Sequence, residues 1–159
     1  MQRYVAVVGP GSPEDPAVLD TARRAGRLLA EAGHVVVTGG LGGVMAAAAD
    51  GASAAGGTTL GLLPGHDRAD AAPGNTVVVP TGLGEMRNAL VVRTADVVLA
   101  VGGSWGTLSE VALAVRTGVP VLAVGSWDLS GFPPPPHGPG PMVCADVDEA
   151  VARIPEVLS

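Results

Sequence analysis

Three short apolar runs in this chain are each followed by a cluster of glycines and then by a segment with helical spacing. The apolar runs are residues 4–8, 34–37 and 96–101, and the glycine clusters that follow them are residues 9–12, 39–43 and 102–107. A β-branched run followed by an amphipathic segment is the pattern of a βαβ unit, whose strands are parallel. The repetition of this pattern predicts an α/β fold built on a parallel sheet.

The rest of the chain continues the alternation of strands and helices. The pattern predicts further strands at residues 58–63, 76–79, 119–124 and 142–144, and helices at residues 15–32, 44–55, 84–94, 107–117 and 147–158. Residues 64–74 are polar and turn-rich, and residues 132–141 are proline-rich, so both segments are expected to be loops. We therefore expect residues 1–159 to form a single doubly wound, Rossmann-like domain. Its mainly parallel sheet should have about six or seven strands, with helices on both faces.

The composition supports this fold class and excludes several functions. Hydrophobic residues make up 47% of the chain but only 3% of residues are aromatic, so the core must consist of Val, Ala and Leu. All nine basic residues are arginine. Without lysine the chain can form neither a pyridoxal-phosphate Schiff base nor a Walker A motif. The net charge of −6, with no basic cluster, argues against nucleic acid as a partner.

The sequence also bears on location, disulfides and metals. Its first residues run into a strand pattern rather than a signal peptide, and no apolar run approaches the ~20 residues of a membrane helix. We expect a cytoplasmic protein with no membrane partner. Cys144 is the single cysteine, so no intramolecular disulfide can form. His66, Asp67 and Asp70 form no metal-ligand motif, so no metal site is expected.

The glycine clusters point to a phosphate site. In open parallel sheets ligands bind at the carboxyl ends of the strands, where helix N-termini offer free N–H groups and a partial positive charge. Glycine lets the backbone approach a ligand closely. No GxGxxG fingerprint follows any strand, which disfavours a conventional NAD-dependent dehydrogenase.

Two of these clusters carry a family resemblance. The run TGGLGGVM at residues 38–45 resembles the first glycine motif of the "lonely guy" (LOG) family, also described as lysine decarboxylase-like. The run GSWGTLSE at residues 103–110 resembles the PGGxGTxxE motif of that family, and Arg87 lies where the family has an Arg-Lys pair. The resemblance covers about residues 4–124. Because residues 102–104 read GGS and residues 85–88 read EMRN, the chain is most similar to the sister branch that includes molybdenum-cofactor carrier proteins and nucleotide-binding relatives.

The resemblance implies a site for a phosphorylated small molecule, either an AMP-like nucleotide or molybdenum cofactor, with no required cofactor. The alternative is a nucleoside 5′-monophosphate phosphoribohydrolase, in which Arg87 and Glu110 would be the catalytic residues. The relatives also imply a homodimer or a higher homo-oligomer. The expected ligand-binding residues are Gly9, Gly11, Ser12, Gly39, Gly40, Gly42, Gly43, Met45, Arg87, Asn88, Gly103, Ser104, Trp105, Gly106, Thr107 and Glu110.

Three of these residues have a structural interpretation as well. Thr107 and Glu110 have the S/T-x-x-E spacing of a capping box, so Glu110 either contacts ligand or caps a helix. Arg87 is either an anion partner or a member of a surface ion pair. Trp105 either stacks on a base or pterin or, as we favour, packs beneath the loop or at a dimer contact.

Overall fold

The computed structural model describes residues 1–159, and every strand in it runs parallel to its neighbours. The sheet has seven strands in the order β4–β3–β2–β1–β5–β6–β7. The strands are β1 Tyr4–Val8, β2 Val35–Thr38, β3 Thr59–Leu63, β4 Val77–Pro80, β5 Val97–Val101, β6 Val121–Val124 and β7 Met142–Val143. The predicted parallel α/β fold and its doubly wound order are therefore confirmed.

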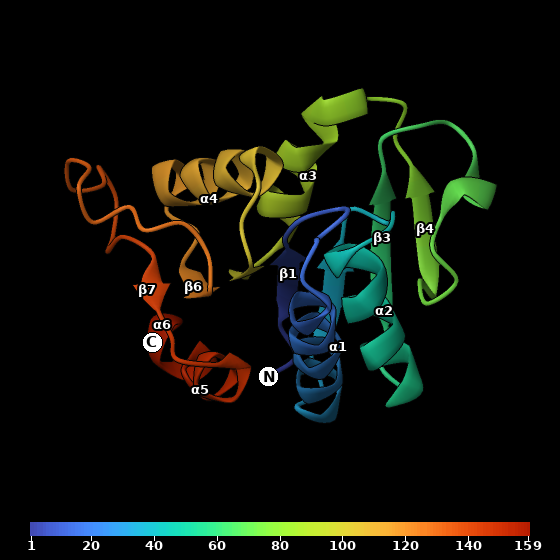
Figure 1. Ribbon diagram of the computed structural model, residues 1–159, viewed down its shortest axis with the longest axis horizontal. Coiled ribbons are helices and arrows are strands. Elements are labelled where there is room, and N and C mark those ends of the chain that lie inside the picture. The colour runs from blue at the N-terminus through green and yellow to red at the C-terminus, as the bar shows by residue number, and fades with distance from the viewer.

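Helices cover both faces of the sheet, as predicted. They are α1 Pro16–Glu31, α2 Val44–Ala54, α3 Arg87–Thr94, α4 Trp105–Thr117, α5 Val147–Ala152 and α6 Ile154–Val157, with short 3₁₀ turns η1 Arg68–Asp70 and η2 Gly84–Met86. One face carries α1, α2, α5 and α6, and the other carries α3 and α4. Figure 1 shows α3 and α4 above the sheet and the other helices below it.

The core is divided by the sheet into two apolar layers. Successive residues of a strand point to opposite faces, so Val5 and Val7 enter the layer beneath α1 and α2, whereas Ala6 and Val8 enter the layer beneath α3 and α4. All four side chains are buried. A strand that is buried on both sides needs a continuous apolar run, which is why these runs are visible in the sequence.

Three predicted helices differ from the observed ones by more than one residue at an end or are divided. Helix α4 begins at Trp105 rather than at residue 107, because Ser104 caps it. The predicted helix 84–94 starts with the 3₁₀ turn η2 before α3 begins. The predicted helix 147–158 is divided into α5 and α6, and Pro155, which has no amide hydrogen for an α-helical bond, lies in the first turn of α6.

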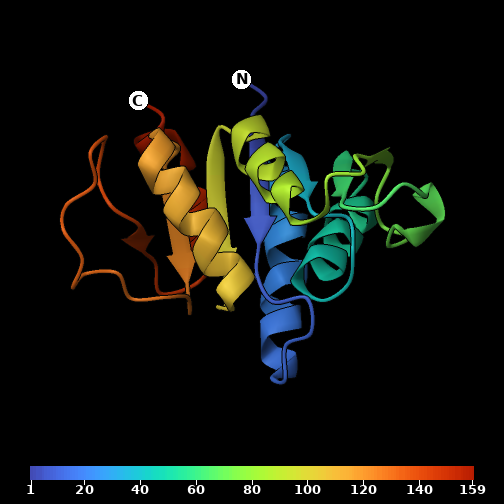
Figure 2. The ribbon, with the colours of Figure 1, turned by 90° about the horizontal axis from the view of Figure 1, so that it is seen from above.

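The strand order reverses beside β1, which separates β2 from β5. The helices that follow the neighbouring strands β1 and β5, which are α1 and α4, lie on opposite faces of the sheet. Such a position opens a crevice at the carboxyl ends of the strands. Figure 2 shows the loop between β1 and α1 at that end of the sheet, with both chain ends at the opposite end. No helix combines the length and apolarity that crossing a bilayer requires.

Candidate ligand site

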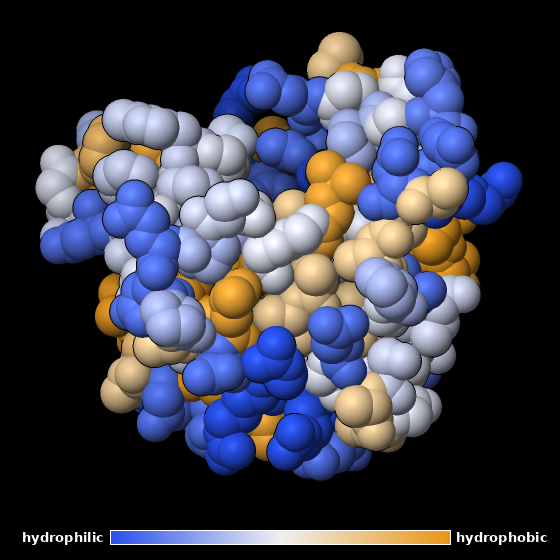
Figure 3. All heavy atoms as spheres, turned by 45° about the vertical axis from the view of Figure 1, so that its right-hand side comes forward, coloured by the Kyte–Doolittle hydropathy of each residue, from blue (hydrophilic) through white to orange (hydrophobic).

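A cleft of about 380 Å³ opens at the carboxyl ends of the strands, where the glycine-rich loops meet. The space-filling view in Figure 3 shows a hollow near its top that is bordered mostly by hydrophilic residues. The cleft is lined by Val7, Val8, Gly9, Gly11, Gly39, Leu41, Met45, Pro64, Gly84, Glu85, Arg87, Asn88, Ser104, Gly106, Thr107 and Glu110. Segments that follow five different strands, β1 to β5, therefore converge on one site.

Ten of the sixteen expected ligand residues line this cleft, and six do not. The six outside it are Ser12, Gly40, Gly42, Gly43, Gly103 and Trp105. Gly43 instead lets the start of α2 lie against the loop after β1, because a Cβ there would overlap the backbone of Pro10 and Gly11. Gly103 leaves room for the ring of Trp127, whose Nε1 would lie 3.1 Å from a Cβ at residue 103. These two glycines are explained by close packing of the loops.

The cleft also contains residues that the sequence interpretation missed. Val7 and Val8 end β1, and Pro64 directly follows β3, so the position of Pro64 after a parallel strand was a usable signal. Gly84 and Glu85 belong to the turn η2, far along the chain from the glycine clusters. Because η2 directly precedes Arg87 and Asn88, which the resemblance places in the site, its position next to them was a usable signal.

The N-terminus of α2 has no side-chain cap. Gly43 is the N-cap residue and makes no capping hydrogen bond. The Val44 amide donates to the Pro10 carbonyl at 3.0 Å, whereas the next two amides, those of Met45 and Ala46, donate to no acceptor in the protein. Free amides and the helix dipole together create a positive potential at this helix start.

Helix α4 has a different cap from the one predicted. Ser104 is the N-cap residue, and its Oγ accepts a hydrogen bond from the Thr107 amide at 3.2 Å. The capping-box interpretation of Thr107 and Glu110 is therefore wrong, because the helix has already begun two residues before Thr107. The amides of Trp105 and Gly106, in the first turn, donate to no protein acceptor. A second helix start with free amides thus meets the cleft.

Arg87 is buried at the side of the cleft, with 7% of its surface exposed. Its guanidinium lies against Gly39, where a Cβ would overlap Nη1. Nη1 donates to Asn88 Oδ1 at 2.9 Å, but Nε has no partner. The interpretation of Arg87 as a surface ion pair is wrong, since the side chain is buried and forms no salt bridge.

Glu110 lies in the same cleft and is also buried. Burial raises the pKa of its carboxyl to about 7, and the positive charge of Arg87 partly opposes this shift. Burial lowers the pKa of Arg87, and the negative charge of Glu110 partly opposes this shift. Near neutral pH the cleft therefore contains one guanidinium and a carboxyl group that is about half protonated.

Trp105 lies outside the cleft, and 78% of its surface is exposed. Its ring packs on Trp127, with the ring centroids 5.3 Å apart and the planes tilted by 40°. Trp127 Nε1 donates to the Ser104 carbonyl at 2.9 Å. The predicted packing of Trp105 is therefore limited to its contact with Trp127, and most of the indole remains exposed.

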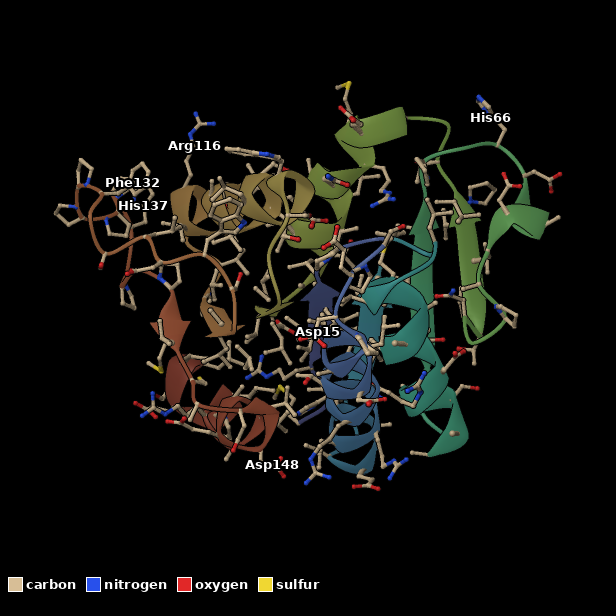
Figure 4. All side chains as sticks on the ribbon, viewed as in Figure 1. Asp15, His66, Arg116, Phe132, His137 and Asp148 are labelled. Atoms are coloured by element: carbon tan, nitrogen blue, oxygen red, sulfur yellow. The ribbon has the colours of Figure 1, made fainter.

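His66, Asp67 and Asp70 do not line the cleft, although Pro64 at the start of the same loop does. Figure 4 shows the His66 side chain pointing outward from the loop between β3 and β4. Asp67 accepts a hydrogen bond from the Ala69 amide at 2.9 Å and so caps the turn η1. Asp67 thus has a local structural role in a solvated loop.

Comparisons with known proteins agree with this architecture. The sequence profile of the SLOG cluster4 family matches residues 2–134. A protein of Archaeoglobus fulgidus is 38% identical over 125 residues, which is 76% of this chain and 78% of that protein. The molybdenum cofactor binding protein of Rippkaea orientalis has a TM-score of 0.89 and 32% identity, covering 100% of this chain and 99% of that chain. The molybdenum cofactor carrier protein of Chlamydomonas reinhardtii has a TM-score of 0.87 and 32% identity, covering 99% of each chain.

The family match spans β1 to β6 and includes both glycine motifs on which the resemblance was based. These structural neighbours belong to the Rossmann-like SLOG/LOG-like superfamily, which confirms that resemblance. The chain belongs to the SLOG cluster4 family.

Proposed function

We propose that this protein binds a phosphorylated cofactor of the molybdenum-cofactor type in the cleft at the carboxyl ends of its strands. The observation that carries the proposal is Arg87, a buried guanidinium that lines the cleft and forms no salt bridge in the protein. A guanidinium that is buried without a salt bridge costs free energy, and an anionic ligand in the cleft would offset that cost.

Three further features support a small anionic ligand. The free amides of Met45 at the start of α2 and of Gly106 at the start of α4 belong to residues that line the cleft. Helix N-termini with free amides are favourable sites for phosphate. Gly39 leaves room for the Arg87 guanidinium and the Met45 sulfur, because a Cβ there would overlap both cleft-lining side chains. The volume of about 380 Å³ is within the ordinary range for small-molecule sites.

The relatives support the choice of ligand. Two solved structures that match nearly the whole chain at 32% identity are described as proteins that bind or carry molybdenum cofactor. In this chain the phosphate would lie by the starts of α2 and α4, with Arg87 as its charge partner. The rest of the cofactor would extend outward along the cleft.

Calorimetric titration with molybdenum cofactor and with GMP tests this proposal. Arg87→Ala should weaken binding of both ligands at least about tenfold, since hydrogen bonds to charged groups contribute about 1.5–3 kcal/mol. Arg93→Ala is the matched control, because Arg93 lies on the same helix but is exposed. Failure of the wild-type protein to bind either ligand, or equal affinity in Arg87→Ala, would contradict the proposal.

A second function is favoured by Glu110, a buried carboxyl in the same cleft with a pKa of about 7. A carboxylate beside the ribose could stabilise the oxocarbenium-like transition state of N-glycosidic hydrolysis. In that reaction the bond from C1′ to the base breaks, water adds to C1′, and the products are free base and ribose 5-phosphate. Chromatography after incubation with nucleoside 5′-monophosphates tests it. Release of base that Glu110→Gln abolishes would establish hydrolysis, whereas binding without release supports the carrier alone.

A further inference from the structure

A second depression adjoins the cleft on its outer side. It has a volume of about 480 Å³ and is lined by Glu85, Met86, Asn88, Trp105, Gly106 and Ser109. Three of these residues, Glu85, Asn88 and Gly106, also line the cleft. This second space, the rim depression, is therefore adjacent to the cleft, so that a ligand anchored by its phosphate in the cleft could extend into it.

Two large apolar side chains border the rim depression and remain exposed. Trp105 comes from the first turn of α4, and Met86 comes from the turn η2, with 78% and 76% of their surfaces exposed. Exposing side chains of this size to water is unfavourable, and apolar patches beside a polar site commonly mark ligand contacts. The two residues form an apolar border on a depression whose other lining residues are polar or glycine.

The indole of Trp105 is held in place from behind. Its ring packs on Trp127, and Trp127 is itself fixed by its hydrogen bond to the Ser104 carbonyl and by its position over Gly103. An aromatic ring that is already positioned loses little conformational entropy when a ligand stacks on it. Trp105 is thus a suitable platform for a planar ring.

The polar residues of the rim depression suit one edge of a particular heterocycle. Asn88 Oδ1 already accepts a hydrogen bond from Arg87, so the Asn88 amide nitrogen is free to donate. The Glu85 side chain forms no salt bridge and no hydrogen bond within the protein, and as a carboxylate it only accepts. A ring that presents an N–H and an amino group beside a carbonyl oxygen matches this pair. Guanine and pterins share that 2-amino-4-oxopyrimidine edge, and adenine does not.

From this arrangement we infer that the rim depression is a ring-binding subsite for a 2-amino-4-oxopyrimidine heterocycle, which stacks on Trp105 and hydrogen-bonds to Glu85 and Asn88. This inference rests on the proposed function, because it requires the phosphate of the same ligand to lie beside Arg87. It adds a specificity that the phosphate site cannot provide, namely a preference for GMP or a pterin phosphate over AMP.

Two ligands separate the ring subsite from the phosphate site. GMP carries both a phosphate and the ring, whereas ribose 5-phosphate carries the phosphate and sugar without a ring. Trp105→Ala should weaken GMP binding about tenfold, the usual scale for loss of one stacked base, and leave ribose 5-phosphate within about twofold. Arg87→Ala should weaken both ligands. Phe132→Ala is the matched control, because Phe132 is also an exposed aromatic residue but lies in the proline-rich loop beyond α4 (Figure 4).

Fluorescence gives an independent readout of stacking. In Trp127→Phe the only tryptophan left is Trp105. GMP should quench its emission in proportion to binding, and ribose 5-phosphate should not. Glu85→Gln should reduce the preference for GMP over AMP, because one of the two accepting oxygens is replaced by an amide nitrogen that donates.

The possible failures are distinguishable. If Trp105→Ala binds GMP as tightly as the wild type while Arg87→Ala does not, the ring subsite is wrong and the phosphate site stands. If the wild type binds neither ligand, the proposed function is wrong and the subsite with it. If Trp105→Ala lowers the oligomer mass in light scattering but not the affinity for GMP, Trp105 is covered by a second copy of the chain, which overturns the inference.

Discussion

Arg87 and Glu110 are buried side by side in one cleft without forming a salt bridge. Taking either charge out of water costs free energy, and only a partner in close contact offsets most of that cost. The part of this desolvation cost that no partner offsets lowers the pKa of Arg87 and raises the pKa of Glu110. The family resemblance identified both residues in advance, but their burial could not be predicted from the sequence.

Glu110 should make the stability of the protein depend on pH in an identifiable way. Its carboxyl has a pKa of about 7 in the folded protein and an ordinary value of 4.5. Between these values the folded state binds more protons than the unfolded state, so its free energy of unfolding falls as pH rises from 4.5 to about 7. The loss is on the order of 3 kcal/mol.

Urea denaturation at a series of pH values measures this effect. Glu110→Gln should remove the decline, leaving the variant less dependent on pH than the wild type over that window. Glu85→Gln is the matched control, because Glu85 is exposed and its loss should leave the decline in place. An identical pH profile for Glu110→Gln and the wild type would show that burial of Glu110 costs little.

The packing of α1 on α2 explains two glycines whose role is not apparent from the sequence. Gly26 of α1 and Gly51 of α2 each face the backbone of the other helix, and a Cβ would overlap the carbonyl of Ala48 or of Arg23 respectively. In the sequence, a glycine within a predicted helix indicates only a weaker helix. The reason for these glycines lies in the close approach of two helix backbones, which no local pattern reveals.

Gly26→Ala should destabilise the fold by about 1–3 kcal/mol or more, because the helices must separate to admit the methyl group. Gly106→Ala in α4 is the control, since the nearest atom to its Cβ would be Ser104 Oγ at 3.8 Å. That variant should be as stable as the wild type or slightly more stable. Chemical denaturation of both variants compares them directly, and equal stability of the two would rule out a tight α1–α2 contact.

At the scale of the whole molecule, the parallel sheet brings distant segments into one site. The starts of α2 and α4 are about sixty residues apart in the chain, yet residues of both line the cleft. A ligand that bridges them should therefore protect both from solvent together. This coupling follows from the topology, because α2 and α4 each begin after the carboxyl end of a different strand of the same parallel sheet.

Hydrogen exchange with and without GMP tests that coupling. The amides of residues 44–46 and 105–107 should gain protection at the same GMP concentration, and those of α5, at the far end of the sheet, should not change. In Arg87→Ala both gains should shift to a higher GMP concentration. Protection confined to one helix start would mean that the two do not share a ligand.

The amino-acid sequence by itself determined the parallel α/β architecture, most element positions and the family. Strand and helix periodicities are local, and a strand buried on both faces must be a continuous apolar run, so runs such as 4–8 and 96–101 were unambiguous. Only the tertiary structure decided that Ser104 rather than Thr107 caps α4, that Arg87 and Glu110 are buried in one cleft, and that Gly103 and Gly43 serve loop packing rather than the cleft. Those features depend on contacts between segments far apart in the chain, whose geometry is set by sheet order and helix packing rather than by any local pattern.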